Sequence, residues 1–293
     1  MEEKVILTTF TDPMMGLSYE CEPIFRKLET HFAGQIAFRY VMSLLVRDVR
    51  DFMTPDELAM EFSEGVRRYN VRLAKIYESE EALGGMPINM TDLRLFSAEC
   101  PSSWPLNLAY HAAKLADADK AELFLYHLRY ATIAECRPTT RTEELLDVVR
   151  ETGIDAERFQ RHWRDGSAEA ALKEDLRLCN RLGVRSLPAY LIQYHGKMAL
   201  LQSFDYGDFV SVIEEVSGGA VRPRTVEPDI DALRELLDRR PLISPIEVRE
   251  AFDLPDTDEA RRLIRPLLEA GEIEIKEAYH GWFIRRKAFR PLQ

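Results

Sequence analysis

The sequence predicts a mixed α/β protein with a second, smaller unit at its C-terminal end. Three observations lead to this prediction. A strand–helix–strand pattern opens the chain, a mostly helical stretch runs from about 54 to 182, and a pair of strands with a closing helix completes the first part before residue 220. An extended segment, residues 221–228, then leads to a tail, residues 229–293, which has helices and a hairpin of its own.

The opening elements are predicted from the spacing of their apolar residues. Lys4–Phe10 is β-branched and apolar, which is typical of a buried strand. From Glu20 onward apolar residues recur three and four positions apart, which predicts a helix up to the turn at Gly34. Ile36–Val46 is again apolar and predicts a second buried strand. A helix between two such strands joins them in parallel, so we expect a βαβ unit.

Helical periodicity dominates the middle of the chain. The predicted helices are Leu58–Glu78, Leu106–Ala116, Ala121–Ala134, Thr142–Thr152, Ala156–Arg164 and Ala168–Leu182. Strand character returns at Leu187–Tyr194 and Lys197–Leu201, which a tight turn at His195-Gly196 connects. A closing helix is expected over Asp208–Glu215. The residues from 1 to about 220 therefore form one domain with a helical insertion.

The tail shows its own start and stop signals. Its predicted elements are a helix over Ile230–Leu237, a helix that begins at Ser244-Pro245, a helix from Asp256 or Thr257 to Leu268, and a hairpin of Glu272–Lys276 and Gly281–Arg285. Pro266 lacks a backbone donor, so we expect a kink or break in the third helix. Three helices followed by a hairpin is the order of a winged-helix-like domain.

Composition excludes several classes of protein. The chain carries 39 basic and 50 acidic residues, so it has no overall positive field for nucleic acid. No apolar run approaches the roughly 20 residues that span a bilayer. The start shows no secretory pattern, so we expect a cytoplasmic protein without a membrane partner. The four cysteines, at positions 21, 100, 136 and 179, have no metal-ligand spacing, and we expect free and mostly buried thiols.

Three stretches carry a resemblance to a known family. The first, residues 10–23, follows the pattern F-x-D-P-x-C-x-x-C-aromatic-x-x-E-P except at its two cysteines. The residues that fit this pattern are Phe10, Asp12, Pro13, Tyr19, Glu22 and Pro23. Gly183–Ala189 is similar to G-V-x-G-x-P-T, and Val148–Phe159 resembles A-x-x-x-G-(I/L)-D-x-x-x-F. Over residues 1–220 the chain thus resembles the FrnE-like branch of the DsbA family.

The resemblance implies a thioredoxin-like fold with a helical insertion, and Pro188 as the cis-proline beside the active-site loop. The family's two catalytic cysteines correspond here to Met15 and Ser18. Disulfide exchange needs a thiolate at the helix N-terminus and a second thiol that resolves the mixed disulfide. A thioether and a hydroxyl supply neither, so we expect this chemistry to be lost. Cys21, one helical turn beyond Ser18, is more plausibly a buried core residue than half of a shifted pair.

The leading hypothesis is a family member without dithiol catalysis that binds an extended peptide or a small thiol between the loop and the cis-proline. The candidate ligand-binding residues are Asp12, Met14, Met15, Gly16, Ser18, Tyr19, Leu187 and Pro188. For Asp12, turn capping is favoured over a ligand contact. An alternative is a glutathione-dependent isomerase or transferase of the kappa type. Related enzymes place a serine where Met15 stands, whereas the serine here comes three residues later.

The tail offers a third class of function, an adaptor or a DNA-binding regulator. Its third helix carries Arg261, Arg262 and Arg265, as a DNA-reading helix would. The tail as a whole has 12 basic and 14 acidic residues, and acidic residues share that helix. We therefore favour a protein partner over DNA. No His, Cys, Asp and Glu pattern predicts a metal site, and glutathione or another small thiol is the only cofactor that the resemblance suggests.

Overall fold

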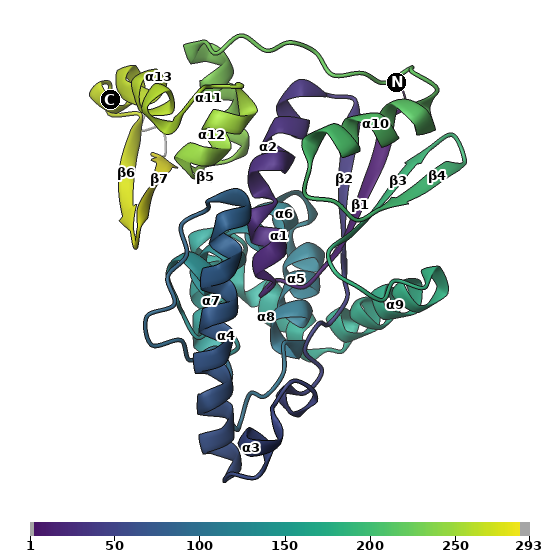
Figure 1. Ribbon diagram of the computed structural model, residues 1–293, viewed down its shortest axis with the longest axis vertical. Helices are drawn as coiled ribbons and strands as arrows, with labels where there is room; N and C mark the ends of the chain where they lie inside the picture. The colour runs from purple at the N-terminus through teal and green to yellow at the C-terminus, as the bar shows by residue number, and fades with distance from the viewer. Residues whose placement is uncertain (1–2, 288–293) are drawn as a thin grey trace.

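The computed structural model describes residues 3–287 (Figure 1). A sheet of four strands lies at its centre, in the order β2-β1-β3-β4. Its strands are β1 (Val5–Thr11), β2 (Ile36–Met42), β3 (Ala189–Tyr194) and β4 (Lys197–Leu201). β1 and β2 run parallel, and β3 is antiparallel to both β1 and β4. The α/β class and the parallel βαβ opening are as the sequence predicts.

One face of this sheet is covered by helices α2 (Glu22–His31) and α10 (Tyr206–Ser217). Aromatic rings fill the space between them: the Phe25 ring centroid lies 5.8 Å from that of Tyr190 and 6.2 Å from that of Phe209. The Phe25–Phe209 pair is edge-to-face, an arrangement that adds to the free energy gained from burying apolar area. A short helix, α1 (Gly16–Glu20), precedes α2, so helical structure begins earlier than the predicted Glu20.

The described insertion between β2 and β3 contains helices but no strands, and a long irregular segment, residues 85–103, joins two of its helices. Its elements are η1 (Val49–Asp51), α3 (Pro55–Leu58), α4 (Phe62–Gly84), α5 (Trp104–Ala116), η2 (Ala118–Lys120), α6 (Ala121–Arg129), the π-helical turn η3 (Tyr130–Ala134), α7 (Thr142–Glu151), α8 (Ala156–Arg164) and α9 (Ser167–Leu182). They enclose the largest apolar core of the protein, and α9 reaches back to cover one end of the sheet.

Two predicted boundaries in this region are wrong. The single helix expected over Leu58–Glu78 is two helices, because Thr54 caps α3 and Glu61 caps α4 by accepting from the amides of Ser63 and Glu64. The strand expected to reach Val46 ends at Met42. Its partner β1 already ends at Thr11, so the following residues have no strand to pair with.

The C-terminal segment forms a second, three-stranded sheet in the order β5-β7-β6. Its elements are α11 (Ile230–Arg239), β5 (Leu242–Ile243), α12 (Pro245–Ala251), α13 (Thr257–Glu269), β6 (Ile273–Ala278) and β7 (Gly281–Arg286). Ser244 and Glu247 form a capping box at the start of α12. The break expected at Pro266 is absent: α13 continues to Glu269, and the exposed position of Pro266 leaves the carbonyl one turn earlier open to water.

This segment packs tightly on the rest of the chain. It has an apolar core of its own, yet Leu242 and Phe283 belong to the core of the helical insertion. The Phe283 ring lies 4.7 Å from that of Tyr130, and α12 lies alongside α2 (Figure 1). The last six residues of the predicted tail, 288–293, lie outside the described part. Within residues 3–287, no helix has the length and apolarity needed to cross a bilayer.

Candidate ligand-binding site at the start of helix α1

The fold brings the two family-like motifs together at one end of β1. The loop after β1 turns on Asp12, whose carbonyl accepts from the Met15 amide at 3.0 Å, and α1 begins at the next residue, Gly16. On the neighbouring strand, Ala189 pairs with Phe10. The Leu187–Pro188 peptide bond, which is cis, therefore lies just beyond the end of β1, where the loop begins.

Asp12 is fully buried and serves the loop itself. Its carboxylate accepts from the Met14 amide at 3.1 Å and from the Leu45 amide at 2.8 Å. The Ser103 hydroxyl and the Asn107 side-chain amide donate to it as well, at 2.6 and 2.8 Å. Burial raises the pKa of Asp12, and these four donors act in the opposite direction. The carboxylate thus joins three segments and presents no free acceptor to a ligand.

The hydroxyl groups of the loop are also engaged within the protein. The Thr11 hydroxyl donates to the Ser18 hydroxyl oxygen at 2.7 Å, and the Tyr19 hydroxyl donates to the Pro87 carbonyl at 2.8 Å. Ser18 is 1% exposed and Tyr19 is fully buried. Burial raises the pKa of Tyr19 well above its ordinary value, so its phenol stays protonated. These two residues act as structural hydrogen-bonding groups.

Helix α4 covers the start of α1. The Tyr77 hydroxyl donates to the Met14 carbonyl, and a Cβ at Gly16 would lie 2.7 Å from the Tyr77 ring and closer still to the Glu80 carboxylate. Only glycine permits so close an approach. Met14 and Met15 are 2% and 5% exposed, and Pro188 is buried. The predicted residues thus meet in one place, but there only Leu17 and Leu187 are partly accessible.

Cys21 is buried against the sheet, as expected. The Tyr190 hydroxyl lies 3.2 Å from its sulfur, and burial raises the pKa of the Cys21 thiol to about 12. The thiol therefore stays protonated near neutral pH and is a poor nucleophile. All four cysteines are free. Cys179 is buried, but Cys100 and Cys136 are only half-buried, so the expectation of mostly buried thiols is right for just two of the four.

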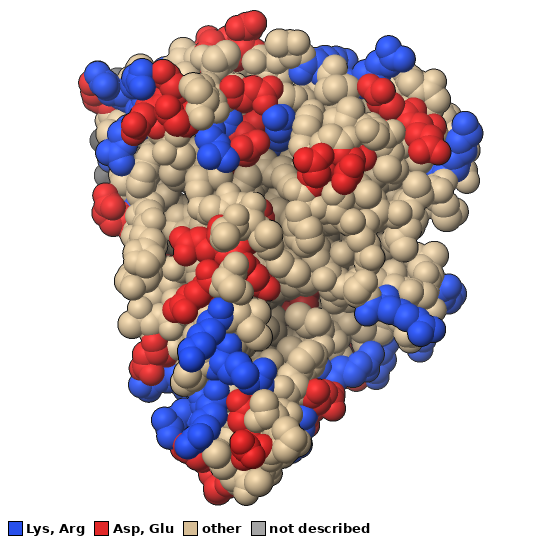
Figure 2. Space-filling model, in the orientation of Figure 1, with Lys and Arg blue, Asp and Glu red and all other residues tan. Residues whose placement is uncertain are grey.

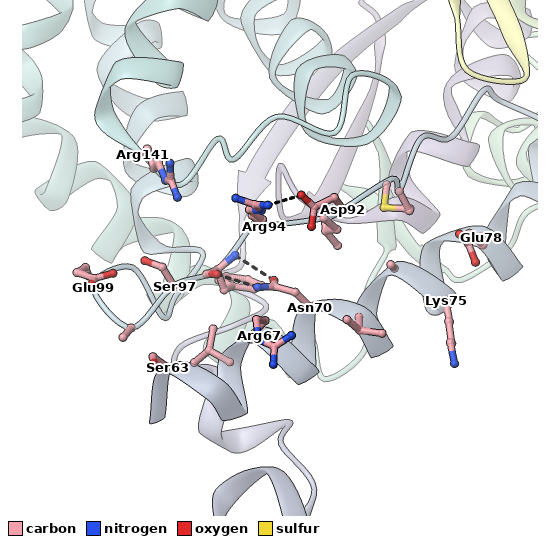
Figure 3. A pocket seen from close by; sticks show the side chains of 17 residues that line it. Ser63, Arg67, Asn70, Lys75, Glu78, Asp92, Arg94, Ser97, Glu99 and Arg141 are labelled. Atoms are coloured by element: carbon pink, nitrogen blue, oxygen red, sulfur yellow. Dashed lines mark hydrogen bonds and ion pairs between the residues drawn. The ribbon is translucent and has the colours of Figure 1, made fainter. Parts of the chain in front are cut away.

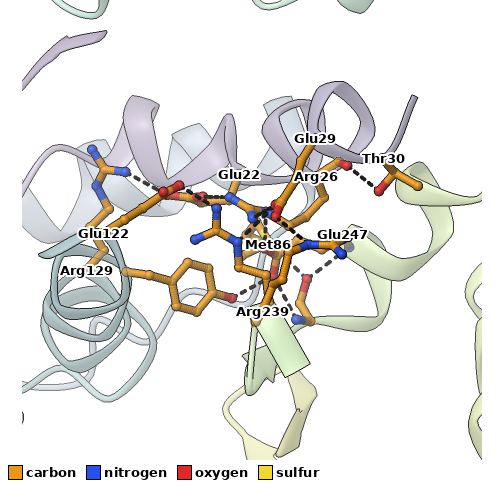
Figure 4. Close-up of polar contacts among 12 residues, drawn as sticks. Glu22, Arg26, Glu29, Thr30, Met86, Glu122, Arg129, Arg239 and Glu247 are labelled. Atoms are coloured by element: carbon orange, nitrogen blue, oxygen red, sulfur yellow. Dashed lines mark hydrogen bonds and ion pairs between the residues drawn. The ribbon is translucent and has the colours of Figure 1, made fainter. Parts of the chain in front are cut away.

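A buried network of charges, which the sequence analysis missed, begins next to Ser18 (Figure 4). We call it the ionic cluster; its members are Glu22, Arg26, Glu29, Glu122, Arg129, Arg240 and Glu247. The Arg129 guanidinium donates to the Thr11 hydroxyl at 2.8 Å and to Glu22 at 2.6 Å. Glu22 in turn accepts from Arg26 at 3.1 Å.

The ionic cluster connects α2 to the C-terminal segment. Arg26 forms an ion pair with Glu29, and its Nε lies 3.5 Å from the Glu247 carboxylate on α12. Glu29 accepts from Arg240 at 3.0 Å, at the end of α11. The sequence does show that Glu22, Arg26 and Glu29 are spaced to lie on one face of a helix. It does not show that residues from distant segments pair with them.

The two ends of the ionic cluster differ electrostatically. Burial by itself would raise the pKa of Glu29, but Arg26 and Arg240 outweigh it and lower that pKa to about 2. Burial instead raises the pKa of Glu247 to about 7, although Arg26 opposes the rise. Glu247 also accepts from the Tyr126 hydroxyl at 2.6 Å and from the Ser244 amide at 2.8 Å. This arrangement fixes α12 on α2.

A cavity with a volume of about 750 Å³ lies elsewhere, between α4 and residues 90–99 (Figure 3). One wall of the cavity is fixed by Asn70: its side-chain amide donates to the Phe96 carbonyl at 2.8 Å, and its side-chain oxygen accepts from the Phe96 amide at 3.1 Å. Charged side chains of both signs, including Arg67 and Asp92, line it. None of the predicted ligand-binding residues contributes to it.

The three arginines predicted for nucleic acid lie on the exposed face of α13. Arg262 pairs with Glu259 at 2.7 Å, and the Arg261 guanidinium lies 4.8 Å from the centre of the Trp282 ring. Arg265 is exposed beside them. Two of the three charges are thus engaged within the segment, and acidic residues share the same helix.

Comparisons with known proteins agree with this geometry. A family model described as thioredoxin matches residues 8–199, which is more than half of the chain. The chain belongs to this thioredoxin family. It is similar in structure to the cytosolic disulfide reductase DsbM from Pseudomonas aeruginosa, with a TM-score of 0.52 and 21% identity, over 72% of this chain and 94% of that one. The fold is thus thioredoxin-like and DsbA-like.

Curated relatives extend the similarity into the C-terminal segment. The ClpXP adapter protein SpxH of Bacillus cereus is 23% identical over 287 residues, which cover 95% of this chain and 90% of that protein. The protein of the same name from Bacillus subtilis is 21% identical over 280 residues, 94% of this chain and 86% of that one. The match to these relatives is therefore nearly full-length, although it is distant.

Proposed function

We propose that this chain is a non-catalytic thioredoxin-family protein that binds partner proteins, as an adapter of the ClpXP type does. The observation that carries the proposal is the pair of residues at the start of α1. By the sequence resemblance, Met15 and Ser18 correspond to the two catalytic cysteines of the DsbA family, and both are buried at the start of α1. Neither side chain forms a thiolate or a disulfide, so the loop has no reactive sulfur.

The similarity to adapter proteins supports the second half of the proposal. It spans nearly the whole chain, including the C-terminal segment that the thioredoxin match leaves out. We assign to that segment, residues 229–293, a winged-helix-like docking role, and to residues 221–228 the role of a linker. The ionic cluster fits such a role, because it holds the segment in one orientation on α2.

Two measurements test the proposal. The first is reduction of insulin by dithiothreitol with and without the protein, with thioredoxin as the positive control. We expect no acceleration, either for the native chain or for Cys21→Ser; turnover that depends on Cys21 would overturn the non-catalytic assignment. The second is binding of the purified chain to immobilised ClpX from the same organism. Absence of a complex at micromolar concentrations would contradict the adapter assignment.

The same protein can be tested for the alternatives. Calorimetric titration with millimolar glutathione should give no binding heat, because the Ser18 hydroxyl is buried and already accepts a hydrogen bond. A gel-shift experiment with duplex DNA at low salt should show no complex, since salt-sensitive binding requires unpaired cations. Binding in either experiment would favour the glutathione-dependent enzyme or the DNA-binding regulator, respectively.

A further inference from the structure

The outer edge of β4 is open. In the sheet order β2-β1-β3-β4, β4 is the last strand, and among the described strands it pairs only with β3. The connecting turn has two residues, His195 and Gly196, with φ angles of 46° and 81°. Such a turn makes its flanking residues, Tyr194 and Lys197, a hydrogen-bonded pair. Backbone groups alternate in direction along a strand, so Met198 and Leu200 direct their N–H and C=O groups outward, away from β3.

The sheet face beside this edge is apolar and only partly covered. Met198 and Leu200 are 58% and 54% exposed. Met198 pairs with Gln193, and Gln193 pairs with Ile6, which is 42% exposed, so these side chains lie on one face. Helix α9 covers that face only near Leu191 and the far end of β1. An edge strand with exposed apolar residues is a template for another strand.

Cations gather on helix α9 and on the loop that follows it, at one end of this edge. Between Asp175 and Asp205 the chain has no acidic residue and four cations, although its net charge is -11. Figure 2 shows Lys and Arg side chains gathered over α9. Arg181 and Arg185 are exposed, and within residues 3–287 neither forms an ion pair. The Gln202 amide donates to the Ser186 carbonyl at 3.3 Å, which places the loop of Arg185 at the end of β4.

We propose that β4 binds an extended, acidic-flanked segment of a partner protein as an additional strand. The backbone groups of Met198 and Leu200 pair with the incoming strand, whose apolar side chains pack on the face formed with Ile6. Acidic residues that flank the segment lie near Arg181 and Arg185. This inference rests on the proposed adapter function and names the surface that takes the partner.

A synthetic peptide provides the probe. It is a fluorescent, end-blocked peptide of alternating valine and threonine with glutamates at both ends, and its control carries lysines in place of the glutamates. We expect the acidic peptide to bind the full chain about tenfold more tightly than the basic one, as measured by fluorescence anisotropy at low salt. Equal binding of the two peptides would overturn the role of the cations.

Variants of β4 test the edge itself. Leu200→Pro removes an outward N–H and leaves the hairpin's own hydrogen bonds intact, so it should weaken binding of the acidic peptide about tenfold or more. Leu200→Glu should have a similar effect. The matched control is Leu83→Glu, since Leu83 is 57% exposed on α4, and this variant should bind as the native chain does. Thermal unfolding checks that each variant is folded.

Arg185→Glu tests the charges without altering the strand. It should weaken binding of the acidic peptide about fivefold and tighten binding of the basic one. Native-like binding by Leu200→Pro would overturn the proposal, as would a concentration-dependent dimer of the native chain that Leu200→Pro abolishes. If ClpX binds and the peptide does not, the adapter function stands and this surface assignment fails.

Discussion

The start of α1 and the ionic cluster both bury polar groups, but they differ in how those groups are satisfied. At the start of α1, Asp12 accepts four hydrogen bonds, and the hydroxyls of Ser18 and Tyr19 are paired within the loop's own surroundings. In the ionic cluster, charges offset one another across two parts of the chain. Among residues 3–287, the Arg26 Nε and one Glu247 oxygen have no hydrogen-bond partner, although the two atoms lie 3.5 Å apart.

This difference indicates what each region does. The paired side chains of Asp12, Ser18 and Tyr19 maintain the shape of the loop, whereas Glu20 and Glu80 beside it each keep one carboxylate oxygen without a hydrogen-bond partner within residues 3–287. Buried opposite charges are strongly destabilising when one partner is removed, because the remaining charge stays desolvated. The ionic cluster therefore makes the orientation of the C-terminal segment depend on a few side chains of α2. Arg129 connects the two regions, since it donates both to Thr11 and to Glu22.

The largest effect is expected in the ionic cluster. Arg26→Met should lower the free energy of unfolding by about 3–5 kcal/mol, because Glu22, Glu29 and Glu247 lose their shared cation. Urea denaturation measures this loss. The matched control is Arg239→Met: Arg239 also pairs with Glu29 but is 45% exposed, so its loss should cost less than about 1 kcal/mol. Equal effects would contradict the comparison.

A smaller loss of stability is expected at the loop. Asp12→Ala removes one acceptor group that serves four donors, and we expect about 2–3 kcal/mol of destabilisation by urea denaturation. Asp48→Ala is the control, since Asp48 caps a short helix from a partly exposed position. It should cost about 1 kcal/mol or less. If Asp12→Ala left stability unchanged, the carboxylate would be free for a role other than holding the loop.

The pH dependence of stability should sharpen the comparison further. Burial raises the pKa of Glu80, beside Gly16, to about 7. The folded state then binds a proton more tightly than the unfolded state, so stability should fall as pH rises from about 4.3 to 7 and level off above. Glu80→Gln should remove the part of this fall that Glu80 contributes, while Glu247 still contributes its own part. The variant should be more stable than the native chain at pH 8 by on the order of 1 kcal/mol, less than the full shift implies because the side chain is partly exposed.

Urea midpoints at pH 5 and pH 8 measure the effect of Glu80→Gln. The exposed Glu64→Gln serves as control, since hydrogen bonds from Arg67 lower the pKa of Glu64 and its removal should not give a gain at pH 8. A Glu80→Gln variant that gained as much at pH 5 as at pH 8 would show that the carboxyl is not the cause.

The rates at which a reagent modifies the four thiols test burial directly, without any substitution. In the native state, a thiol reagent such as dithionitrobenzoate should modify Cys100 first, because that residue is half-buried. Cys136 should follow more slowly, as burial raises the pKa of its thiol to about 11. Cys21 and Cys179 should react only on unfolding. Early modification of Cys21, identified by mass spectrometry, would contradict the closed site.

The sequence was most informative where local chemistry decides the outcome. Ser244-Pro245 predicted the start of α12, and the β-branched run after Lys4 predicted β1. It was least informative about boundaries that depend on a partner. The end of β2 is set by the end of β1, and the division of the helix after Thr54 is set by competing caps.

By itself, the sequence determined that no thiol follows β1 at Met15 or Ser18, because the identity of a side chain fixes its chemistry wherever it lies. The tertiary structure alone decided that α4 covers this loop, that Arg26 meets Glu247, and that the face beside β4 is left partly exposed. The physical reason is that periodicity records which face of an element is apolar, whereas burial and desolvation depend on what the distant parts of the chain place against it.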